Sequence, residues 1–395
     1  MTQEQTAPTP PAAPPPARTG WLEILGARSL RMVLVLVGLW ILIAAGADAE
    51  ARRGFLTPGN FSNLTAQNAD IIIIGVGMTL VVCIRGIDLS VGAGIALAGV
   101  IAAKALGEHH LPALVAAALA IVALSVLGLW HGVLVSRLRI PAFIATLSGF
   151  LAYRGAALVL SGSQGLSLDD KLSVLAGVVP AAPSIVLCVT ALAVGLGLLG
   201  AREQRRRKLG LPGEGPVALA AQALGMLLAT VFFAVIYQDG MPVPVLIAAL
   251  AAGLGAVLLN RSRLGRYAFA IGGNAEAARL SGVPVERVTV AIYALTGVLT
   301  AVAGLVVAAR TNGVTPSNAG VMRELNVVSA VVIGGTSLNG GRATMLGTVI
   351  GALIFGTLSN GMNMVGVNSN WQLILTGMIL LGASMLDALS TNKRP

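Results

Sequence analysis

The sequence is poor in charged, aromatic and cysteine residues. Charged residues occupy 11% of its 395 positions, and aromatic residues occupy 4%. A soluble globular protein carries about 25% charged residues, so this shortage excludes a soluble chain. The only two cysteines, Cys83 and Cys188, both lie in apolar runs. That placement indicates packing residues rather than a disulfide or a metal site.

The sequence also lacks the motifs that carry chemistry in the common enzyme classes. It contains no Gly-x-x-x-x-Gly-Lys-[Ser/Thr] loop, which would cradle the phosphates of ATP. It holds no nucleophile–base pair and no cluster of metal ligands. We therefore expect no catalytic residue, no metal site and no cofactor bound by this chain.

What is present is a hydrophobic chain rich in glycine. Hydrophobic residues make up 56% of the sequence, 49 residues are glycine, and the mean hydropathy is +0.85. Small residues let transmembrane helices approach closely, so the glycine content indicates helix–helix packing. At about 20 residues per crossing, the sequence predicts an all-α polytopic membrane bundle of about eleven to twelve segments. The predicted full spans are 29–47, 65–84, 90–106, 113–136, 141–161, 184–200, 216–237, 243–260, 286–309, 343–360 and 370–388. The apolar piece Leu325–Ile333 is too short to cross and is predicted to be a half-helix.

The basic residues predict the orientation of the chain. The net charge is +10, and most of the 26 basic residues fall on one side of the predicted topology. By the positive-inside rule, both termini are then cytoplasmic, and the basic excess does not imply a nucleic-acid partner. We expect a disordered Pro-rich cytoplasmic tail (1–28), a transmembrane domain (29–390) and a short C-terminal tail (391–395). The basic run Arg202–Lys208 is predicted to anchor its span at lipid headgroups, or alternatively to bind a specific partner.

Two related glycine-rich motifs interrupt the apolar segments. Gly86–Gly92 reads Gly-Ile-Asp-Leu-Ser-Val-Gly, Gly335–Gly341 reads Gly-Thr-Ser-Leu-Asn-Gly-Gly, and a Val-Val pair precedes each. In transporters, hydrophobic segments interrupted at corresponding places in the two halves are typical of broken helices beside the substrate. We therefore predict that these two motifs are broken helices that flank a transport pathway. The motif residues assigned this role are Gly86, Asp88, Ser90, Gly92, Gly335, Thr336, Ser337, Asn339 and Gly340.

Asp88 is the most informative residue of the first motif. A carboxylate at the centre of a membrane helix costs about 2.5–3.5 kcal/mol, so its charge must be satisfied locally. One interpretation is that Asp88 or Ser90 caps a helix that begins near Val91, with Arg85 as the charge partner. A direct contact with substrate is the other interpretation. In a self-sufficient secondary transporter driven by an ion gradient, Asp88 would instead be the coupling carboxylate.

A polar segment at 261–285 is predicted to be a cytoplasmic loop. Within it, Ala275–Leu280 favours a short helix, opened by Asn274 as its cap and closed by Gly282. Such a helix could insert into a groove on a soluble partner, or it could lie on the lipid surface.

These segments resemble one protein family. Glu276-Ala277-Ala278-Arg279-Leu280-Ser281-Gly282 is similar to the Glu-Ala-Ala-x-x-x-Gly coupling-loop signature of bacterial ABC importer permeases. Gly86–Gly92 resembles the Ile-Asp-Leu-Ser-Val-Gly motif of their monosaccharide branch, and Gly334–Leu338 resembles its second motif. Pro141–Gly149 and Asn360–Met364 also look like segments of this family, so the resemblance covers about residues 55–390.

The resemblance implies the permease subunit of an ATP-driven, binding-protein-dependent monosaccharide importer in the bacterial inner membrane. It implies as partners a second copy of the chain, cytoplasmic ABC ATPase subunits that use ATP and Mg, a periplasmic sugar-binding protein and membrane lipid. It also implies that the loop couples to the ATPase, through Asn274, Glu276, Ala277, Ala278, Arg279 and Gly282.

The expected sugar is D-xylose or a related pentose or hexose. The extra region around 184–240 and the basic run 202–208 look most like the D-xylose members, although Arg85 and His131 depart from their pattern. Polar residues on the path should be sparse, and those predicted to line it are Gln67, Asn68, Asn360 and Asn363.

Overall fold

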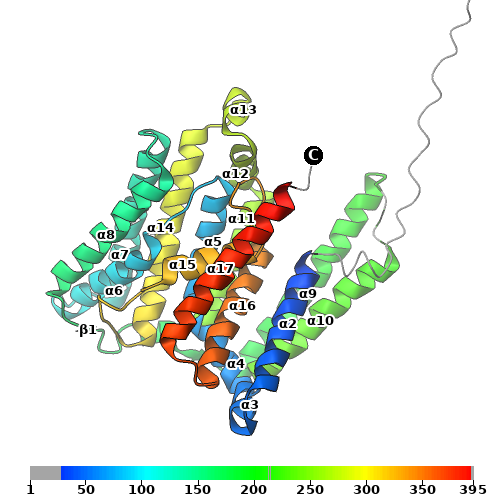
Figure 1. The fold of residues 1–395 in the computed structure, drawn as a ribbon, viewed down its shortest axis with the longest axis horizontal. Helices are drawn as coiled ribbons and strands as arrows, with labels where there is room; N and C mark the ends of the chain where they lie inside the picture. Colours follow the sequence, from blue (N-terminus) through cyan, green and yellow to red (C-terminus); the bar gives the residue numbers. More distant parts are fainter. Residues whose placement is uncertain (1–27, 212, 214, 393–395) are drawn as a thin grey trace, which may run out of the picture.

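The computed structural model describes residues 28–392 except 212 and 214, and most of them form α-helices (Figure 1). Most of the predicted tail at 1–28 and the last three residues of the chain lie outside the described residues. The helices are α2 (Arg28–Gly46), α3 (Ala49–Phe55), α4 (Pro58–Gln67), α5 (Ala69–Cys83), α6 (Val91–Gly107), α7 (Ala113–Ser136), α8 (Ala142–Ser161), α9 (Ala181–Lys208), α10 (Pro216–Ile236), α11 (Val243–Arg261), α12 (Arg263–Gly273), α13 (Ala275–Leu280), α14 (Val285–Arg310), α15 (Arg323–Ile333), α16 (Met345–Met364) and α17 (Ser369–Asn392). A 3₁₀ turn covers Ser173–Ala176. Two short antiparallel pairs join β1 (Leu166–Ser167) to β4 (Gly313–Val314) and β2 (Val178–Val179) to β3 (Met241–Pro242).

The all-α membrane bundle is confirmed. Seven of the described helices are long and apolar enough to cross a membrane, or eight if one bent pair counts as a single span. The predicted spans 29–47 and 90–106 are shorter apolar helices, Met32–Gly46 within α2 and Val91–Gly107. The apolar piece at 325–333 forms the short helix α15, as predicted.

The predicted span 65–84 is wrong at its N-terminal end, because the helix breaks at Asn68. There α4 ends and α5 begins, and the two helices meet at a bend of 43°. The Asn68 side chain turns back and donates a 2.8 Å hydrogen bond to the Leu64 carbonyl. It lies against Gly356 of α16, where a Cβ would come within 2.3 Å of the amide nitrogen. A side chain that competes for backbone partners ends the helix here.

Helices α5 and α14 form the centre of the molecule. Every residue of α5 is buried, and α14 packs along α7, where glycines let the two backbones touch. A Cβ on Gly128 would lie 2.3 Å from the Tyr293 carbonyl oxygen, and one on Gly297 would lie 2.1 Å from that of Leu124. Glycine at this crossing therefore acts in packing, as its abundance indicated. Cys83 and Cys188 are buried free thiols, in agreement with a packing role.

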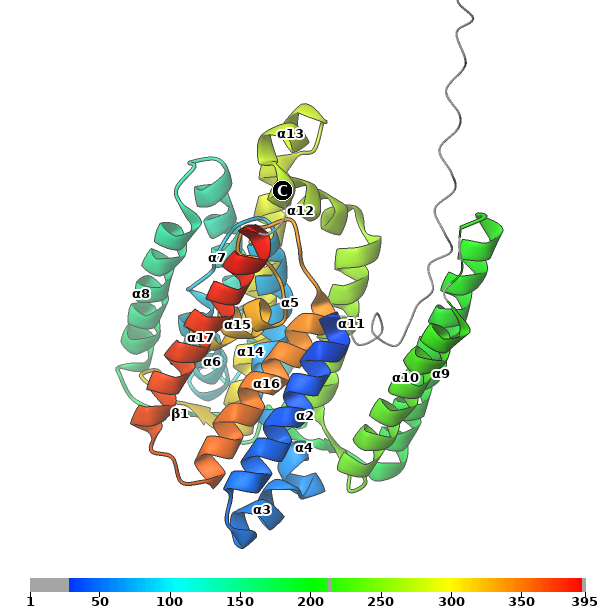
Figure 2. The ribbon, with the colours of Figure 1, turned by 45° about the vertical axis from the view of Figure 1, so that its right-hand side comes forward.

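The α9–α10 hairpin stands apart from the bundle (Figure 2). It is tied to the bundle near α4, where the Tyr237 hydroxyl donates a 3.0 Å hydrogen bond to Thr65 Oγ1 and the Phe232 ring stacks on Trp40 at 5.2 Å. The basic run Arg202–Lys208 forms the last two turns of α9. Cations at a helix C-terminus interact favourably with its carbonyl ends, which explains why the helix continues through them.

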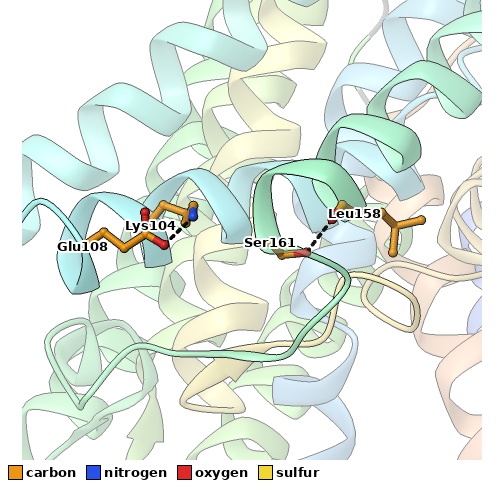
Figure 3. Close-up of polar contacts among 4 residues, drawn as sticks. All are labelled: Lys104, Glu108, Leu158 and Ser161. Carbon is orange, nitrogen blue, oxygen red and sulfur yellow. Dashed lines mark hydrogen bonds and ion pairs between the residues drawn. The ribbon is translucent and has the colours of Figure 1, made fainter.

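Two helix ends at the end of the bundle opposite α13 carry local side-chain bonds. At the end of α6, Lys104 pairs with Glu108, and at the end of α8 the Ser161 hydroxyl donates a 3.1 Å hydrogen bond to the Leu158 carbonyl (Figure 3). The chain then runs from α8 into β1, which pairs with β4 beyond the end of α14.

Candidate functional site: a protruding helix joined to two helix breaks

The short helix predicted in the 261–285 segment is present as α13, and it projects from one end of the molecule (Figures 1 and 2). The Asn274 side chain accepts 3.0 Å hydrogen bonds from the backbone N–H groups of Glu276 and Ala277, so it caps the helix as predicted. Gly282 follows with φ +80°, a left-handed conformation that suits glycine at a helix C-terminus.

The surface of α13 is open on nearly every side. Only Ala278 is buried, and Glu276, Ala277 and Arg279 are exposed. Leu280 is 82% exposed, which is unusual for so large an apolar side chain on a small polar protrusion. An exposed apolar side chain on a capped helix can enter a hydrophobic groove of a partner.

Helix α12, between α11 and α13, was missed by the sequence analysis. Ser262 caps it by accepting a 3.1 Å hydrogen bond from Gly265 N. Leu264, Ala268 and Ile271 pack on the core. The sequence does contain a signal for this helix. Its apolar residues follow the helical i, i+3, i+4, i+7 spacing, at Leu264, Tyr267, Ala268 and Ile271. The segment 261–285 is therefore a pair of short helices that extends from the bundle, with α13 at its tip.

The first glycine-rich motif is a helix break, as predicted. Helix α5 ends at Cys83 and α6 begins at Val91. Asp88 is buried, and its Oδ1 accepts hydrogen bonds of 2.9 Å from Ser90 N and 2.6 Å from Ser90 Oγ. The carboxylate therefore fixes the turn into α6, while the Ser90 side chain makes no cap bond to that helix.

Arg85 is not the charge partner of Asp88. It adopts φ +66° and donates hydrogen bonds of 2.8 and 2.7 Å to the carbonyls of Gly272 and Gly273. These carbonyls end α12 directly before the cap of α13. A guanidinium on the free carbonyls of a helix end satisfies them and is favoured by the helix dipole.

The second motif is also a break, and it meets the first. It connects α15 to α16, with Gly335 at φ +89° and Gly340 at φ +75°. Thr336 and Ser337 are buried and Asn339 is exposed. Gly341 N donates a 3.0 Å hydrogen bond to the Cys83 carbonyl at the end of α5.

Three backbones therefore cross at one point, which we call the glycine junction: Cys83–Gly86, Gly272–Gly273 and Gly340–Gly341. A Cβ on Gly272 would lie 1.9 Å from the Cys83 carbonyl oxygen and 2.3 Å from Gly341 N. A Cβ on Gly340 would lie 2.5 Å from the Arg85 side chain. The base of the protruding helix pair is thus in close backbone contact with both breaks, and the Arg85 side chain bonds it to the first.

A small polar cavity lies behind the first motif. It measures about 10 Å³ and is lined by Asp88, Ser90, His131 and Tyr153, among others. His131 is buried, and its ring nitrogens lie 3.3 and 3.4 Å from the Tyr153 hydroxyl. This volume is close to the smallest that holds one water molecule.

The four residues predicted to line a substrate path lie at the end of α4, at the break after it and on α16. Gln67 is exposed, and Asn68 is held at the break between α4 and α5. Asn360 pairs with Asn60 by two hydrogen bonds of 3.0 and 3.1 Å. Asn363 accepts a 2.7 Å hydrogen bond from Gln372. Each amide has a local structural partner or faces outward, so their role on a path stays a prediction.

Comparison with known proteins identifies the relatives of the chain. Residues 60–384 match the family described as the branched-chain amino acid transport system permease component. The xylose transport system permease protein XylH of Escherichia coli K12 is 33% identical over 378 residues, which are 93% of this chain and 95% of that protein. The corresponding protein of Haemophilus influenzae is 35% identical over 380 residues, 93% of this chain and 98% of that protein. The ribose import permease protein RbsC of Escherichia coli K12 is 34% identical over 352 residues, 89% of this chain and 92% of that protein.

No solved structure matches the chain. The family match and the seven apolar helices support an integral protein of the bacterial inner membrane. The match covers the glycine junction, both breaks and the protruding helix α13. The chain is a multi-pass permease that belongs to the family of branched-chain amino acid transport system permease components.

Proposed function

We propose that this chain is the membrane subunit of an ATP-driven importer of a monosaccharide, D-xylose or a related pentose or hexose. The observation that carries the proposal is the capped, exposed helix α13, whose base is hydrogen-bonded to the first helix break and packs against the second. The sugar class rests on the xylose and ribose permeases among the relatives.

The geometry explains how a movement of the ATPase subunits, transmitted to α13, would reach the two helix breaks in the membrane. A force on α13 passes to the end of α12, where Arg85 and Cys83 hold Gly272 and Gly273 through hydrogen bonds and backbone contact. Because close-packed backbone cannot be compressed, a displacement of this base must move the breaks. Rigid-body movement of packed helices is one of the ordinary routes of conformational switching.

The proposed assembly contains two copies of this chain, two cytoplasmic ABC ATPase subunits and a sugar-binding protein on the outer face. ATP and Mg are used by the ATPase subunits. The end of the bundle that carries α13 faces the cytoplasm, in agreement with the basic residues Arg263, Arg266 and Arg279 at that end.

Stimulated ATP hydrolysis tests this proposal. The chain, purified with its ATPase in lipid nanodiscs, is expected to hydrolyse ATP several-fold faster when xylose-loaded binding protein is added. Empty binding protein is the control and should stimulate less. The proposal would be contradicted if the loaded binding protein did not raise the rate of ATP hydrolysis and sugar uptake needed no ATPase.

An Asp88→Asn substitution separates the importer from the ion-coupled secondary sugar transporter, in which Asp88 would carry the ion. Asparagine Oδ1 can accept the same hydrogen bonds from Ser90, so an importer should keep its uptake and its unfolding temperature nearly unchanged. Asp88→Leu leaves the buried Ser90 donors unpaired, at a cost of about 1–3 kcal/mol each, and should lower the unfolding temperature. A loss of uptake in a fully stable Asp88→Asn protein would instead favour the ion-coupled carrier.

A further inference from the structure

A cavity of about 540 Å³ lies at the far end of α14 from α13. It is open to one side and lined by α6, the segment 165–167, the end of α14 and the segment 311–326. Helix α14 has 26 residues, so at about 1.5 Å per residue it separates this cavity from α13 by more than the hydrocarbon thickness of a bilayer. The volume falls within the range of about 300–1,000 Å³ that is typical of small-molecule sites.

The lining of this outer cavity contains both polar and apolar side chains, and one of them, Arg323, is charged. Its Nε lies 2.9 Å from the Oδ2 of Asp70, a carboxylate that is 1% exposed on α5. The ion pair neutralises the guanidinium and holds it in place. A site whose one charge is already paired does not favour an anion, because an anionic ligand would have to compete with Asp70.

Several lining groups remain available for a ligand. The side chains of Thr315, Asn318 and Asn326 line the cavity and make no hydrogen bond within the described part of the chain. A hydroxyl and two amides can both donate and accept, as the hydroxyl groups of a sugar require. A glycine on the wall, Gly165, keeps the space open.

The cavity wall rests on the first glycine-rich motif. A Cβ on Gly92 would lie 2.7 Å from the Gly320 carbonyl oxygen and would overlap the carboxylate of Glu324. A Cβ on Gly320 would lie 2.0 Å from the Gly92 carbonyl oxygen. Because these backbones touch, a movement of the break at Gly86–Gly92 displaces the segment that carries Asn318 and Arg323.

We propose that the outer cavity is a docking site for one neutral monosaccharide, and that the first glycine-rich motif reshapes it when α13 moves. The inference rests on the proposed importer function and extends it by placing a sugar site on this chain. Thr315, Asn318 and Asn326 bond the sugar hydroxyls, while Arg323, held by Asp70, orients them.

Protection of an introduced thiol tests the site directly. In a Cys188→Ser background, Thr315→Cys places a thiol in the cavity, and His109→Cys places one in an exposed position at the same end. The native thiol of Cys83 is buried and should not react. At a D-xylose concentration of about twice its dissociation constant, occupancy predicts about threefold slower maleimide labelling of Thr315→Cys and no change for His109→Cys.

D-Glucuronate, which has a carboxylate, is the charged comparison. It should not slow the maleimide labelling of Thr315→Cys. Labelling of Thr315→Cys that is unchanged by saturating D-xylose would overturn the proposal, as would a lipid headgroup found in the cavity instead. Equal protection by D-glucuronate would overturn the assignment to neutral sugars. ATP hydrolysis stimulated by the loaded binding protein, measured on the same sample, reports on the importer function separately.

Filling the cavity tests its part in transport. A Cβ on Gly165 would have its nearest atoms at 3.6 and 3.9 Å, so Gly165→Trp can place its ring in the cavity without a backbone clash. We expect xylose uptake to fall by about tenfold while the amount of folded protein stays unchanged. Gly107→Trp, at an exposed glycine with nothing within 4 Å, is the matched control and should transport normally. Normal uptake by folded Gly165→Trp would overturn the proposal.

Discussion

A Leu280→Asp substitution is expected to abolish ATP hydrolysis stimulated by the binding protein and to stop sugar uptake. Leu280 is 82% exposed, so the change costs the permease itself almost nothing. If Leu280 fills a pocket on the ATPase, its burial contributes about 1.5–3 kcal/mol to docking, and a carboxylate in the same pocket adds a desolvation penalty. We therefore expect docking to weaken by more than about tenfold. Co-purification with the ATPase and stimulated hydrolysis measure this loss.

Leu209→Asp is the matched control for this substitution. Leu209 is also an exposed leucine (62%), placed just after α9 and away from α13. The Leu209→Asp substitution should leave co-purification with the ATPase and stimulated hydrolysis unchanged. Two further changes act on the same helix: Glu276→Arg reverses the charge of its first turn, and Gly282→Trp places a large side chain at φ +80°. If Leu280→Asp and both of these preserve stimulated hydrolysis, coupling does not pass through α13.

The second large effect is expected at the glycine junction, from Gly272→Ala. The new methyl group would lie 1.9 Å from the Cys83 carbonyl oxygen, so the three backbones of the junction must move apart. Overpacking against fixed backbone costs about 1–3 kcal/mol or more. The separation should also stretch the hydrogen bonds from Arg85, which lie at this point. We expect a lower unfolding temperature and, in the protein that still folds, hydrolysis that no longer responds to the binding protein.

The neighbouring glycine provides the control. A Cβ on Gly273 would have nothing within 4 Å, so Gly273→Ala should keep both stability and stimulated hydrolysis. Arg85→Ala probes the same contact without adding volume, because it removes the two hydrogen bonds to the end of α12. Wild-type stimulation in both Gly272→Ala and Arg85→Ala would show that force does not pass through the junction.

The sequence was sufficient for the features that depend on neighbouring residues. Asn274 and Gly282 are the cap and the stop of α13, because both act within a few residues of the chain. The breaks at Gly86–Gly92 and Gly335–Gly341 were also predictable, since glycine and polar residues interrupt apolar periodicity. Interpretations of single polar residues were less accurate. Arg85 appeared to pair with Asp88 because they are close in sequence, but its partners lie far along the chain, at Gly272 and Gly273.

The sequence by itself therefore determined that this is a helical membrane protein with two helix breaks and a capped helix on one face. Hydrophobic content, glycine interruptions and helix caps depend on neighbouring residues, so they can be recognised in the sequence. Only the tertiary structure decided that Cys83, Gly272 and Gly341 meet at one point, that the helix bends at Asn68, and that Arg323 lies against Asp70 over an open cavity. These depend on close approach between segments distant in sequence, and glycine content alone does not reveal which backbones will touch.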